Sequence, residues 1–414
     1  MISNRLAAYL TIRGVHYGWA ALGATFLVMA ATAGAMGASG VIIAPLEAEF
    51  GWSNADISSA LAIRLALYGL IGPFAAALIN RIGARAVVGA AVTLIAIGVA
   101  GTASMRHLWQ LELFWGVVVG LGSGMTALVL GATVATRWFS ARRGLAVGLL
   151  TASNATGQLV FLPLLAAVSG HWGWRAALAV VVAILVVALA FALALLRDRP
   201  ADVGLPPYGE HAIVPAPKTN AGFASLVSAP LVALRDGAKN RVFWVLFATF
   251  FICGLSTNGL IQTHWITLCG DFGVAPVGAA SILAMIGVFD FFGTILSGWL
   301  SDRYDNRWLL FFYYGLRGLS LFAVFYGLDW VATVPPTVRL AADAFGPERA
   351  NVTFGWIFAA HQLGAACAAF GAGAARTELA SYLPAVYVAG AACLIASALV
   401  MTLAQPRRRE AALA

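Results

Sequence analysis

Long apolar runs separated by short polar segments dominate the pattern of this 414-residue chain. Most runs hold about 20 residues or more, the length that an α-helix needs to cross the hydrocarbon core of a bilayer. Only helices and closed barrels satisfy their backbone hydrogen bonds in lipid, and these runs are continuous rather than alternating. The pattern therefore predicts an all-α polytopic membrane protein. The runs lie at approximately 17–46, 57–79, 86–105, 109–136, 144–168, 175–196, 242–269, 275–300, 308–340, 352–374 and 382–404.

Part of this pattern occurs twice. Segments 49–85 and 271–307 have matching acidic-Phe-Gly starts and arginine-containing ends, at a constant offset of 222 positions. A fixed offset over that length indicates an internal repeat of the kind that membrane transporters use. A polar, proline-containing break separates the copies. We therefore expect an N-terminal helical bundle at 1–196, a cytoplasmic linker at 197–240 and a C-terminal helical bundle at 241–414.

The second copy is shorter after its arginine-containing loop. From Arg85 to Phe139 the first half spans 54 positions, whereas the matching interval from Arg307 to Phe345 spans 38. Two crossings and a turn need about 40 residues or more. The run at 308–340 is therefore either one crossing or two short ones. We expect twelve crossings, with helices 9 and 10 compressed or partly missing.

Charge is scarce and unevenly placed. The chain is 61% hydrophobic and 10% charged, with a net charge of +8, whereas soluble domains carry about 25% charged residues. The cations lie in short loops beside the apolar runs, which is the positive-inside pattern rather than a nucleic-acid surface. This pattern predicts that both termini are cytoplasmic. We expect an inner (plasma) membrane location, no nucleic-acid partner and a monomer.

Motifs for enzymatic chemistry are absent from the sequence. It contains no GxxxxGK[ST] phosphate loop, no HExxH zinc motif and no GxSxG nucleophile elbow. The four cysteines are scattered, without the spacing of a metal site or a disulfide framework, and read as small apolar residues. We therefore expect no metal, no cofactor and no enzyme activity.

One loop motif resembles that of a known family. Gly298, Asp302, Arg303 and Arg307 form the pattern Gly-x-x-x-Asp-Arg-x-x-x-Arg, which is similar to the signature between helices 2 and 3, and 8 and 9, of the major facilitator superfamily. The resemblance implies two six-helix bundles with a substrate path that opens to each side in turn. It also implies a gating loop whose charges hold a neighbouring helix in one state and release it in the other. The alternative is topological, with the arginines only keeping the loop inside.

The first-half copy of this loop is incomplete. It keeps Arg81 and Arg85, whereas Ala76 stands in place of the glycine and Asn80 in place of the aspartate. The second copy is therefore the intact member of the pair.

Other segments carry the same resemblance. Residues 173–175, Gly-Trp-Arg, are typical of the superfamily. Residues 49–53 (Glu-Phe-Gly-Trp-Ser) and 327–330 (Gly-Leu-Asp-Trp) resemble its monocarboxylate-porter and oxalate/formate-antiporter branch. In that branch an arginine four residues after an aspartate in helix 8 grips the substrate carboxylate, and related porters place a basic residue in helix 1. Here the first position is Thr294, and the run at 17–46 holds neither lysine nor arginine.

Four charged residues lie well inside apolar runs: Arg64, Asp290, Arg317 and Asp329. Charges inside a membrane are costly and usually functional. Asp290 lies near the middle of its run, which suits a proton-carrying carboxyl, and its alternative role is a structural carboxyl held by a neighbouring helix. Arg64 is a candidate anion anchor or a side chain that snorkels to the outer headgroups. Arg317 and Asp329 lie in the compressed segment and are candidates for a structural pair or for a functional role.

The seventh run is unusually polar. Asn258 and Gln262 share one face at i, i+4 spacing and are candidates for substrate or gating contact, with interhelical hydrogen bonding as the alternative. His264 lies on another face together with Thr257, either at headgroup level or in the site. Two polar faces on one helix cannot both meet lipid, so at least one should face a cavity or another helix.

Two further polar pairs are candidates for the same reason. Asn154 and Gln158 repeat the i, i+4 spacing in the fifth helix, and His361 and Gln362 are adjacent in the eleventh. Histidine is the side chain whose ordinary charge change lies closest to neutral pH, and hydrogen bonding between helices is the structural alternative.

Together these features predict a secondary-active transporter of a small organic solute. The favoured substrate class is a monocarboxylate-like organic anion, with symport or antiport coupled to protons through Asp290 as a hypothesis. The missing cations in helices 1 and 8 leave a drug or neutral-solute exporter as the alternative. A non-transporting membrane receptor or scaffold, or a homologue inactivated by the short 308–340 segment, is the alternative of another class.

Overall fold

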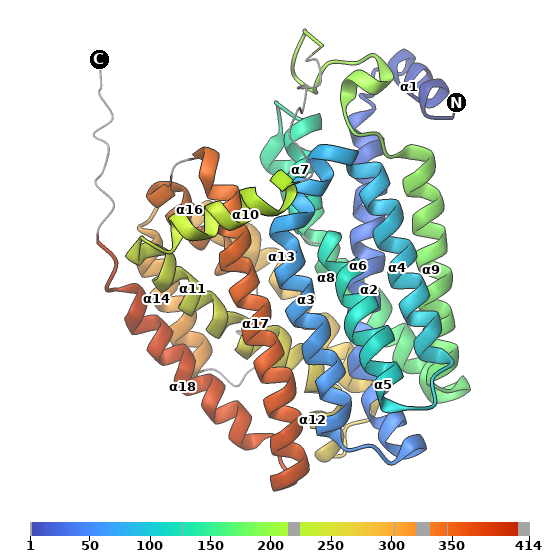
Figure 1. The fold of residues 1–414 in the computed structure, drawn as a ribbon, viewed down its shortest axis with the longest axis vertical. Helices are drawn as coiled ribbons and strands as arrows, with labels where there is room; N and C mark the ends of the chain where they lie inside the picture. The colour runs from blue at the N-terminus through green and yellow to red at the C-terminus, as the bar shows by residue number, and fades with distance from the viewer. Residues whose placement is uncertain are drawn as a thin grey trace.

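The computed structural model describes residues 2–126, 128–213, 224–301, 303–319, 332–345 and 347–404, and helices make up most of this part of the chain (Figure 1). In the first half they are α1 (Ile2–Ile12), α2 (Gly18–Phe50), α3 (Asn54–Ile82), α4 (Ala84–Ala103), α5 (Leu108–Leu111), the π-helix η1 (Glu112–Val118), α6 (Val119–Met125), α7 (Leu128–Trp138), α8 (Arg143–Trp172), α9 (Trp174–Leu195) and the 3-10 helix η2 (Pro200–Val203). After it come α10 (Ala224–Gly237), α11 (Arg241–Gly254), the π-helix η3 (Leu255–Gln262), α12 (Thr263–Asp271), α13 (Pro276–Ser301), α14 (Asn306–Leu319), α16 (Val334–Phe345), α17 (Pro347–Leu379) and α18 (Leu383–Val400).

Many of these helices have the length and composition of membrane spans. Within the described residues, eight are long and apolar enough to cross a membrane. They are Gly18–Phe50, Asn54–Ile79, Ala84–Ala103, Trp174–Leu195, Arg241–Asp271, Pro276–Ser301, Val352–Leu379 and Leu383–Val400. The all-α prediction is therefore confirmed.

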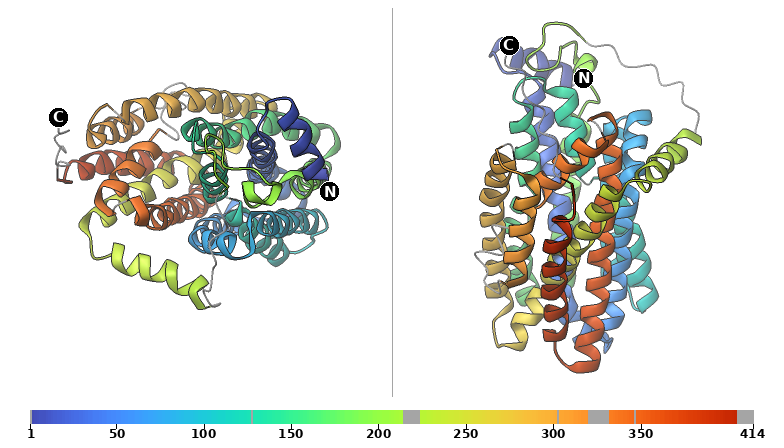
Figure 2. Two further views of the ribbon diagram at one scale, coloured as in Figure 1. Left: turned by 90° about the horizontal axis from the view of Figure 1, so that it is seen from above. Right: turned by 90° about the vertical axis from the view of Figure 1, so that its left-hand side faces the viewer.

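Helices α2 to α9 gather on one side of the molecule and α11 to α18 on the other (Figure 1). Viewed from above, α10 lies apart at the periphery (Figure 2). The N-terminal helix α1, α7 and α10 lie towards the same end of the long axis, whereas α5 and α12 lie towards the other (Figure 1). We call the first of these the linker end, and the other the opposite end.

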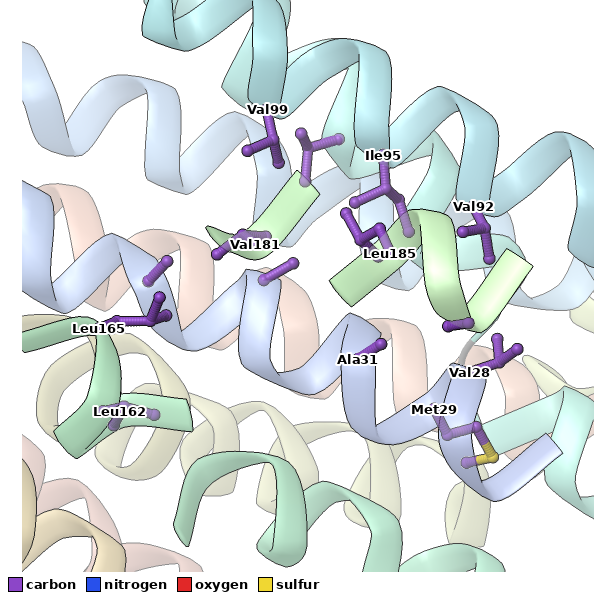
Figure 3. Close-up of a cluster of buried hydrophobic side chains, with 14 of the residues drawn as sticks. Val28, Met29, Ala31, Val92, Ile95, Val99, Leu162, Leu165, Val181 and Leu185 are labelled. Carbon is purple, nitrogen blue, oxygen red and sulfur yellow. The ribbon is translucent and has the colours of Figure 1, made fainter. Parts of the chain in front are cut away.

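Apolar side chains from four helices of the first half form a common core between α2, α4, α8 and α9 (Figure 3). Such a core arises because each helix presents small or branched residues that allow close interdigitation. Its members include Val28, Met29, Ala31, Val92, Ile95, Val99, Leu162, Leu165, Val181 and Leu185.

Local sequence sets the sharp turn between α2 and α3. Gly51 ends α2 in the left-handed region with φ of 68°, which favours glycine. Ser53 then caps α3, since its hydroxyl accepts from the Asp56 amide and the Asp56 carboxylate accepts from the Ser53 amide. A capping box of this kind typically stabilises a helix start by about 1 kcal/mol.

The segments 49–53 and 173–175 contact each other. The Glu49 carboxylate accepts hydrogen bonds from Trp174 Nε1 and Arg175 Nη1, each at 2.7 Å. Arg175 also donates through Nε to the carbonyl of Ala103 at 3.1 Å. These contacts join the end of α2 to the start of α9 and, through Arg175, to the end of α4. All three lie at the opposite end of the molecule.

The described part of the compressed region contains helices α14 and α16. Helix α14 has 14 residues and α16 has 12, which corresponds to about 21 Å and 18 Å of helix. Both are shorter than the roughly 30 Å hydrocarbon core of a bilayer. These lengths agree with the expected compression of helices 9 and 10, and twelve crossings stay a prediction. Residues 320–331 between them lie outside the described part.

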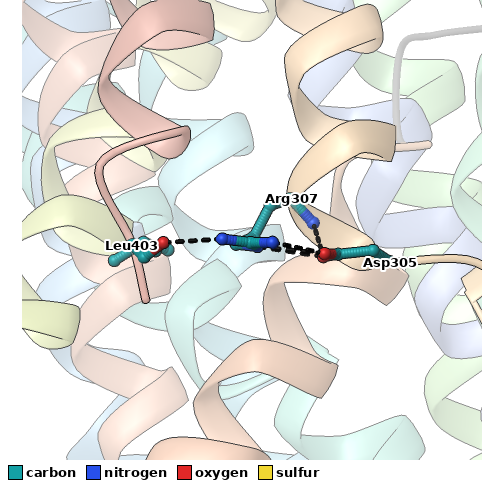
Figure 4. A network of polar contacts seen from close by, with 3 residues as sticks. All are labelled: Asp305, Arg307 and Leu403. Carbon is teal, nitrogen blue, oxygen red and sulfur yellow. Dashed lines mark hydrogen bonds and ion pairs between the residues drawn. The ribbon is translucent and has the colours of Figure 1, made fainter. Parts of the chain in front are cut away.

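A polar network anchors the start of α14 (Figure 4). Arg307 donates to Asp305 through Nε and Nη2, with 2.6 Å between Nη2 and Oδ2, and through Nη1 to the carbonyl of Leu403 at 2.8 Å. Because Leu403 follows α18, this arginine joins the loop after α13 to the last helix. The Arg307 guanidinium holds the pKa of the Asp305 carboxyl below its usual range.

This network predicts a pH-dependent contribution to stability. A depressed carboxyl pKa adds stability above the unfolded value near pH 4, and that contribution is lost as the pH falls through the lower folded pKa. We expect Asp305→Asn to have a lower thermal stability than the wild type at pH 7. On acidification from pH 5 to pH 3, the variant should lose less stability than the wild type does. Thermal unfolding in detergent at both pH values measures this. Equal acid sensitivity of the two proteins would contradict the prediction.

In the first half, a carboxylate from the linker, that of Asp198, lies next to the arginine-containing loop between α3 and α4. The Asp198 carboxylate accepts from the Arg85 backbone amide at 2.9 Å, and it packs so close to Gly83 that a side chain there would collide with it. Arg137 Nη1 donates to the Asp198 carbonyl at 3.5 Å. Asp198 thus places an acidic group against the loop that has Asn80 where the second copy has an aspartate.

Candidate functional site

Helices of the two halves meet along α3 and α17, which we call the α3–α17 seam. At the opposite end the Ala55 amide donates to Thr377 Oγ1 at 3.1 Å, and towards the linker end the rings of Phe74 and Trp356 lie 6.0 Å apart. The seam is therefore closed at both ends in this structure. Further contacts between the halves join α8 to α13 and α2 to α12.

Glycines allow the backbones to approach at the middle of this contact. A side chain at Gly69 of α3 would collide with Gln362 of α17 and come within 3.1 Å of the Ala359 carbonyl. On α2, a side chain at Gly40 would come within 3.4 Å of the carbonyls of Gln262 and Thr263. Helices α2, α3, α17 and the end of η3 thus converge in the middle of the molecule, where small residues let helices pack and slide.

Arg64 is buried at this level. It follows Asn54, the first residue of α3, by ten positions, which is about 15 Å along the helix and near the middle of a bilayer core. Its side chain is 2% exposed, so protein encloses it almost completely. Neither Nε nor Nη1 has a hydrogen-bond partner among the residues that the structure describes. A buried guanidinium with unused donors is costly and is suited to an anionic ligand.

The surroundings of Arg64 place it beside the seam. On α3 it shares a stripe with Leu61 and Tyr68, and Gly69 of the neighbouring stripe approaches α17. The Tyr68 ring lies 5.8 Å from that of Phe358 on α17. Arg64 therefore lies at the border between the interior of the first half and the contact between the halves.

His361 and Gln362 face this region from α17. Gln362 Nε2 lies 3.2 Å from His361 Nδ1, and Gln362 Oε1 is buried without a hydrogen-bond partner in the described part of the chain. The His361 ring stacks on Phe358, and His361 also interacts with the thiol of Cys253. The structure thus brings this predicted pair to the same contact region as Arg64.

The polar residues of the seventh run divide between two environments. Asn258 and Gln262 are half-buried in η3, a π-helix, which is a form that often occurs at functional sites. Thr257 and His264 are fully buried, and His264 Nε2 lies 2.8 Å from the Ala369 carbonyl of α17. One polar face therefore packs against another helix, as expected. The His264 ring is enclosed by protein, and it also lies 5.1 Å from the ring of Tyr382, which precedes α18.

Asp290 lies in the middle of α13 and is half-buried. Its carboxylate accepts a hydrogen bond from Thr294 Oγ1 at 3.2 Å, the position where the resembled branch has an arginine. Asn154 is half-buried on α8, the helix against which α13 packs. The side chain of Gln158 lies outside the described residues.

One contact escaped sequence analysis. Arg317 Nη1 donates to Cys253 Sγ at 3.0 Å, and the same sulfur lies 3.3 Å from Thr333 Oγ1. These residues come from α11, α14 and the start of α16. A cysteine in an apolar run gives no indication of such a partner, so the sequence predicts only a small apolar residue at Cys253. Asp329, the candidate partner of Arg317, lies outside the described residues.

The arginine-containing loop between α13 and α14 makes contacts within its own half. Arg303 lies over the Trp299 ring, 4.1 Å from its centroid, and donates to the Trp299 carbonyl. Gly298 has open space around it, so no close approach requires a glycine there in this structure. Asp302 and the side chain of Asn80 lie outside the described residues. In the first half, Arg81 is exposed.

Comparisons with known proteins agree with this architecture. The family model described as "Major Facilitator Superfamily" matches residues 24–334. Monocarboxylate transporter 13 of Rattus norvegicus is 26% identical over 403 residues, covering 94% of this chain and 89% of that protein. Monocarboxylate transporter 11 of Mus musculus is 31% identical over 320 residues, covering 74% of this chain and 65% of that protein.

A solved structure supports the fold independently. The crystal structure of a D-xylose-proton symporter superposes with a TM-score of 0.68 at 14% identity, covering 94% of this chain and 98% of that one. The family model covers most of the chain, and the helices and the loop motifs agree with it. The chain is therefore a multi-pass membrane protein that belongs to the major facilitator superfamily of transporters.

Proposed function

We propose that this protein is a secondary-active transporter of a small organic anion of the carboxylate type. The observation that carries the proposal is Arg64, a guanidinium buried at mid-membrane depth with two unused nitrogen donors. A planar carboxylate can accept two parallel hydrogen bonds from such a fork. The relatives named monocarboxylate transporters support this substrate class.

In this proposal the substrate binds between the halves, beside the α3–α17 seam. Arg64 holds the carboxylate, while Gln362 and His361 from α17 and Asn258 and Gln262 from η3 supply polar contacts from the second half. Binding groups on both sides of the seam allow the substrate to stabilise a closed state, from which the seam opens at one end or the other.

The same proposal includes the arrangement of the two bundles and their orientation in the membrane. Residues 1–196 and 241–414 act as two bundles that rock about the site, and the linker, both termini and the two arginine-containing loops lie in the cytoplasm, as the positive-inside pattern indicates. The location is the inner (plasma) membrane. The gating loops, with Arg81, Arg85, Arg303 and Arg307, control opening at the linker end.

Uptake into proteoliposomes tests the substrate class. The purified protein is reconstituted, and uptake of labelled lactate, pyruvate and oxalate is measured with and without a pH gradient. Competition by carboxylates but not by neutral or cationic solutes of similar size is expected. Competition by neutral or cationic solutes alone would favour a drug or neutral-solute exporter, and no flux of any solute would favour a receptor or scaffold.

Asp290→Asn is expected to abolish stimulation of uptake by a pH gradient while leaving exchange of substrate across the membrane intact. The reason is that a mid-membrane carboxyl carries a proton only if it can ionise, whereas exchange without net flux needs no proton. Uptake and counterflow in the same proteoliposomes separate the two activities, with Thr294→Val as the matched control. Full pH-driven uptake by Asp290→Asn would refute proton coupling at this residue.

A further inference from the structure

Helix α10, which lies between the two halves in the sequence, packs across the linker end of the α3–α17 seam. It contacts both helices, α3 from the first half and α17 from the second. In Figure 1 it runs across α17 towards α3, and Figure 2 shows it at the periphery of the molecule. A helix that touches both halves at one end of their contact can hold that end closed or release it.

Trp356 of α17 joins three helices at this point. Its buried indole Nε1 donates to the carbonyl of Pro230 in α10 at 2.8 Å, and its ring lies 6.0 Å from that of Phe74 in α3. Beside it, a side chain at Gly355 of α17 would meet Pro73 of α3 at 3.5 Å. Because α10 contacts both helices, separation of the halves at this end has to detach α10 from one of them.

One side of α10 faces the protein. Pro230 and Gly237 are buried and Leu234 is half-buried, and all three lie on one side of the helix at positions i, i+4 and i+7. Leu234 packs against the apolar cluster that includes Trp356. A side chain at Gly237 would come within 3.5 Å of Thr353 on α17. We call this the inner side of α10.

The apolar surface of α10 continues beyond the inner side. Val227 and Leu231 each precede a residue of the inner side by three positions, which places them beside it on the helix, and they are 49% and 45% exposed. We call these two residues the outer arc. The far side of the helix carries exposed polar residues, which are Ser228, Arg235 and Asp236. A helix with this pattern on a membrane protein is suited to the boundary between headgroups and acyl chains.

Exposed tryptophans mark the membrane level next to α10. Trp244, at the start of α11, is exposed, and its Nε1 donates to the carbonyl of Ala238, directly after α10, at 2.8 Å. Trp299 near the end of α13 and Trp308 near the start of α14 are exposed as well. Such residues are enriched where headgroups meet hydrocarbon. Helix α10 therefore begins and ends near that level, and the bilayer surface is the partner that covers its outer arc.

We propose that α10 is a membrane-anchored strap that holds the seam closed at the linker end. Its inner side holds α17 and α3 together at Trp356, and its outer arc rests in the surface of the bilayer. Opening of the seam at this end requires the strap to detach. The proposal rests on the rocking of the two bundles in the proposed function, but it depends neither on the substrate nor on Arg64.

Hydrogen–deuterium exchange in nanodiscs that hold one copy of the protein, without substrate, tests the strap. Trp356→Phe removes the indole donor and keeps a ring. Amides near Phe74 and Gly355, at the linker end of α3 and α17, should exchange about fivefold faster, which is the effect of losing one hydrogen bond of about 1 kcal/mol. Amides near Ala55 and Thr377 should not exchange faster, because opening at one end leaves the other closed.

Matched variants separate the two sides of the strap from general effects. Val227→Ser combined with Leu231→Ser should also speed exchange at the linker end of α3 and α17, because serine gains little from burial in lipid. Val232→Ser, at an exposed valine that lies outside the outer arc, should change nothing. Trp308→Phe, at an exposed tryptophan of α14, is the control for Trp356→Phe and should also change nothing.

Three results would overturn the proposal. Unchanged exchange at the linker end of α3 in Trp356→Phe would show that α10 does not hold the halves together. Faster exchange at both ends of the seam would show a general loss of stability. An effect of the two serines that is absent, or that occurs only in discs holding two copies, would show that lipid does not anchor the strap.

A second variant covers the case in which Trp356→Phe fails to fold. Leu234→Ala removes apolar contact from the inner side of α10 and should give the same exchange pattern. Failure of the transport proposal is measured separately, because it appears as the absence of solute uptake by the wild type, whereas the strap is measured by exchange without any solute.

Discussion

Replacing Arg64 with glutamine is expected to reduce carboxylate transport at least about 100-fold. That loss corresponds to about 3 kcal/mol, the size expected when a buried hydrogen-bonded charge pair loses one partner. Arg64→Lys should retain part of the activity, because an ammonium keeps the charge but not the planar fork. Initial rates of uptake into proteoliposomes measure the effect.

Removing the charge of Arg64 is expected to lower transport but to raise the stability of the folded protein. In the protein without substrate, the Arg64 guanidinium is buried with two unused donors, so removing its charge relieves a desolvation cost. We expect Arg64→Met to raise the free energy of unfolding by about 1–3 kcal/mol while abolishing transport. Arg106→Gln, at an exposed arginine, is the matched control and should change neither quantity. A destabilised Arg64→Met protein would instead indicate that Arg64 has a structural role.

The second large effect is expected at Gly254, the last residue of α11. A methyl group there would overlap the carbonyl oxygen of His361 on α17, and a methyl group at Gly364 would overlap the carbonyl of Phe251 on α11. Backbone atoms cannot move aside as a flexible side chain can. We expect Gly254→Ala to lower the free energy of unfolding by about 3 kcal/mol or more and to shift His361 away from Cys253.

Gly371 provides the control for this prediction. It lies on α17 as well, is exposed, and has no atom within 4 Å of the position that a methyl group would take. Gly371→Ala should therefore leave stability within about 0.5 kcal/mol of the wild type. Thermal unfolding of both variants in the same detergent measures the difference. Equal stabilities of the two variants would show that α11 and α17 can separate without cost.

Much of the architecture followed from the sequence for a simple reason. Lipid offers no hydrogen-bond partners to the backbone, so a continuous apolar run of sufficient length has to be helical. The interval from Arg307 to Phe345 is shorter than two full crossings need, and its described part holds helices α14 and α16. The loop motif with Gly298 and Arg307 identified the superfamily, since it combines a specific spacing with a recognisable place between two runs.

The candidate site was only partly predictable. A charge inside an apolar run is visible in the sequence, which is why Arg64 and Asp290 were found. Whether Arg64 reaches the headgroups or stays buried depends on how α3 is rotated against its neighbours, and helical periodicity does not determine that rotation. The π-helix η3 was also not predicted, because one extra residue in a turn hardly changes an apolar pattern.

The sequence by itself determined that this chain is a helical membrane protein, where its helices lie and to which superfamily it belongs. These properties depend on composition and spacing along the chain, because each helix satisfies its own backbone hydrogen bonds. The tertiary structure decided which side chains meet: Glu49 with Trp174 and Arg175, Arg317 with Cys253, and Asp198 with the loop at Gly83. Such partners are distant in the chain, and only the close packing of helices, permitted by glycines, brings them together.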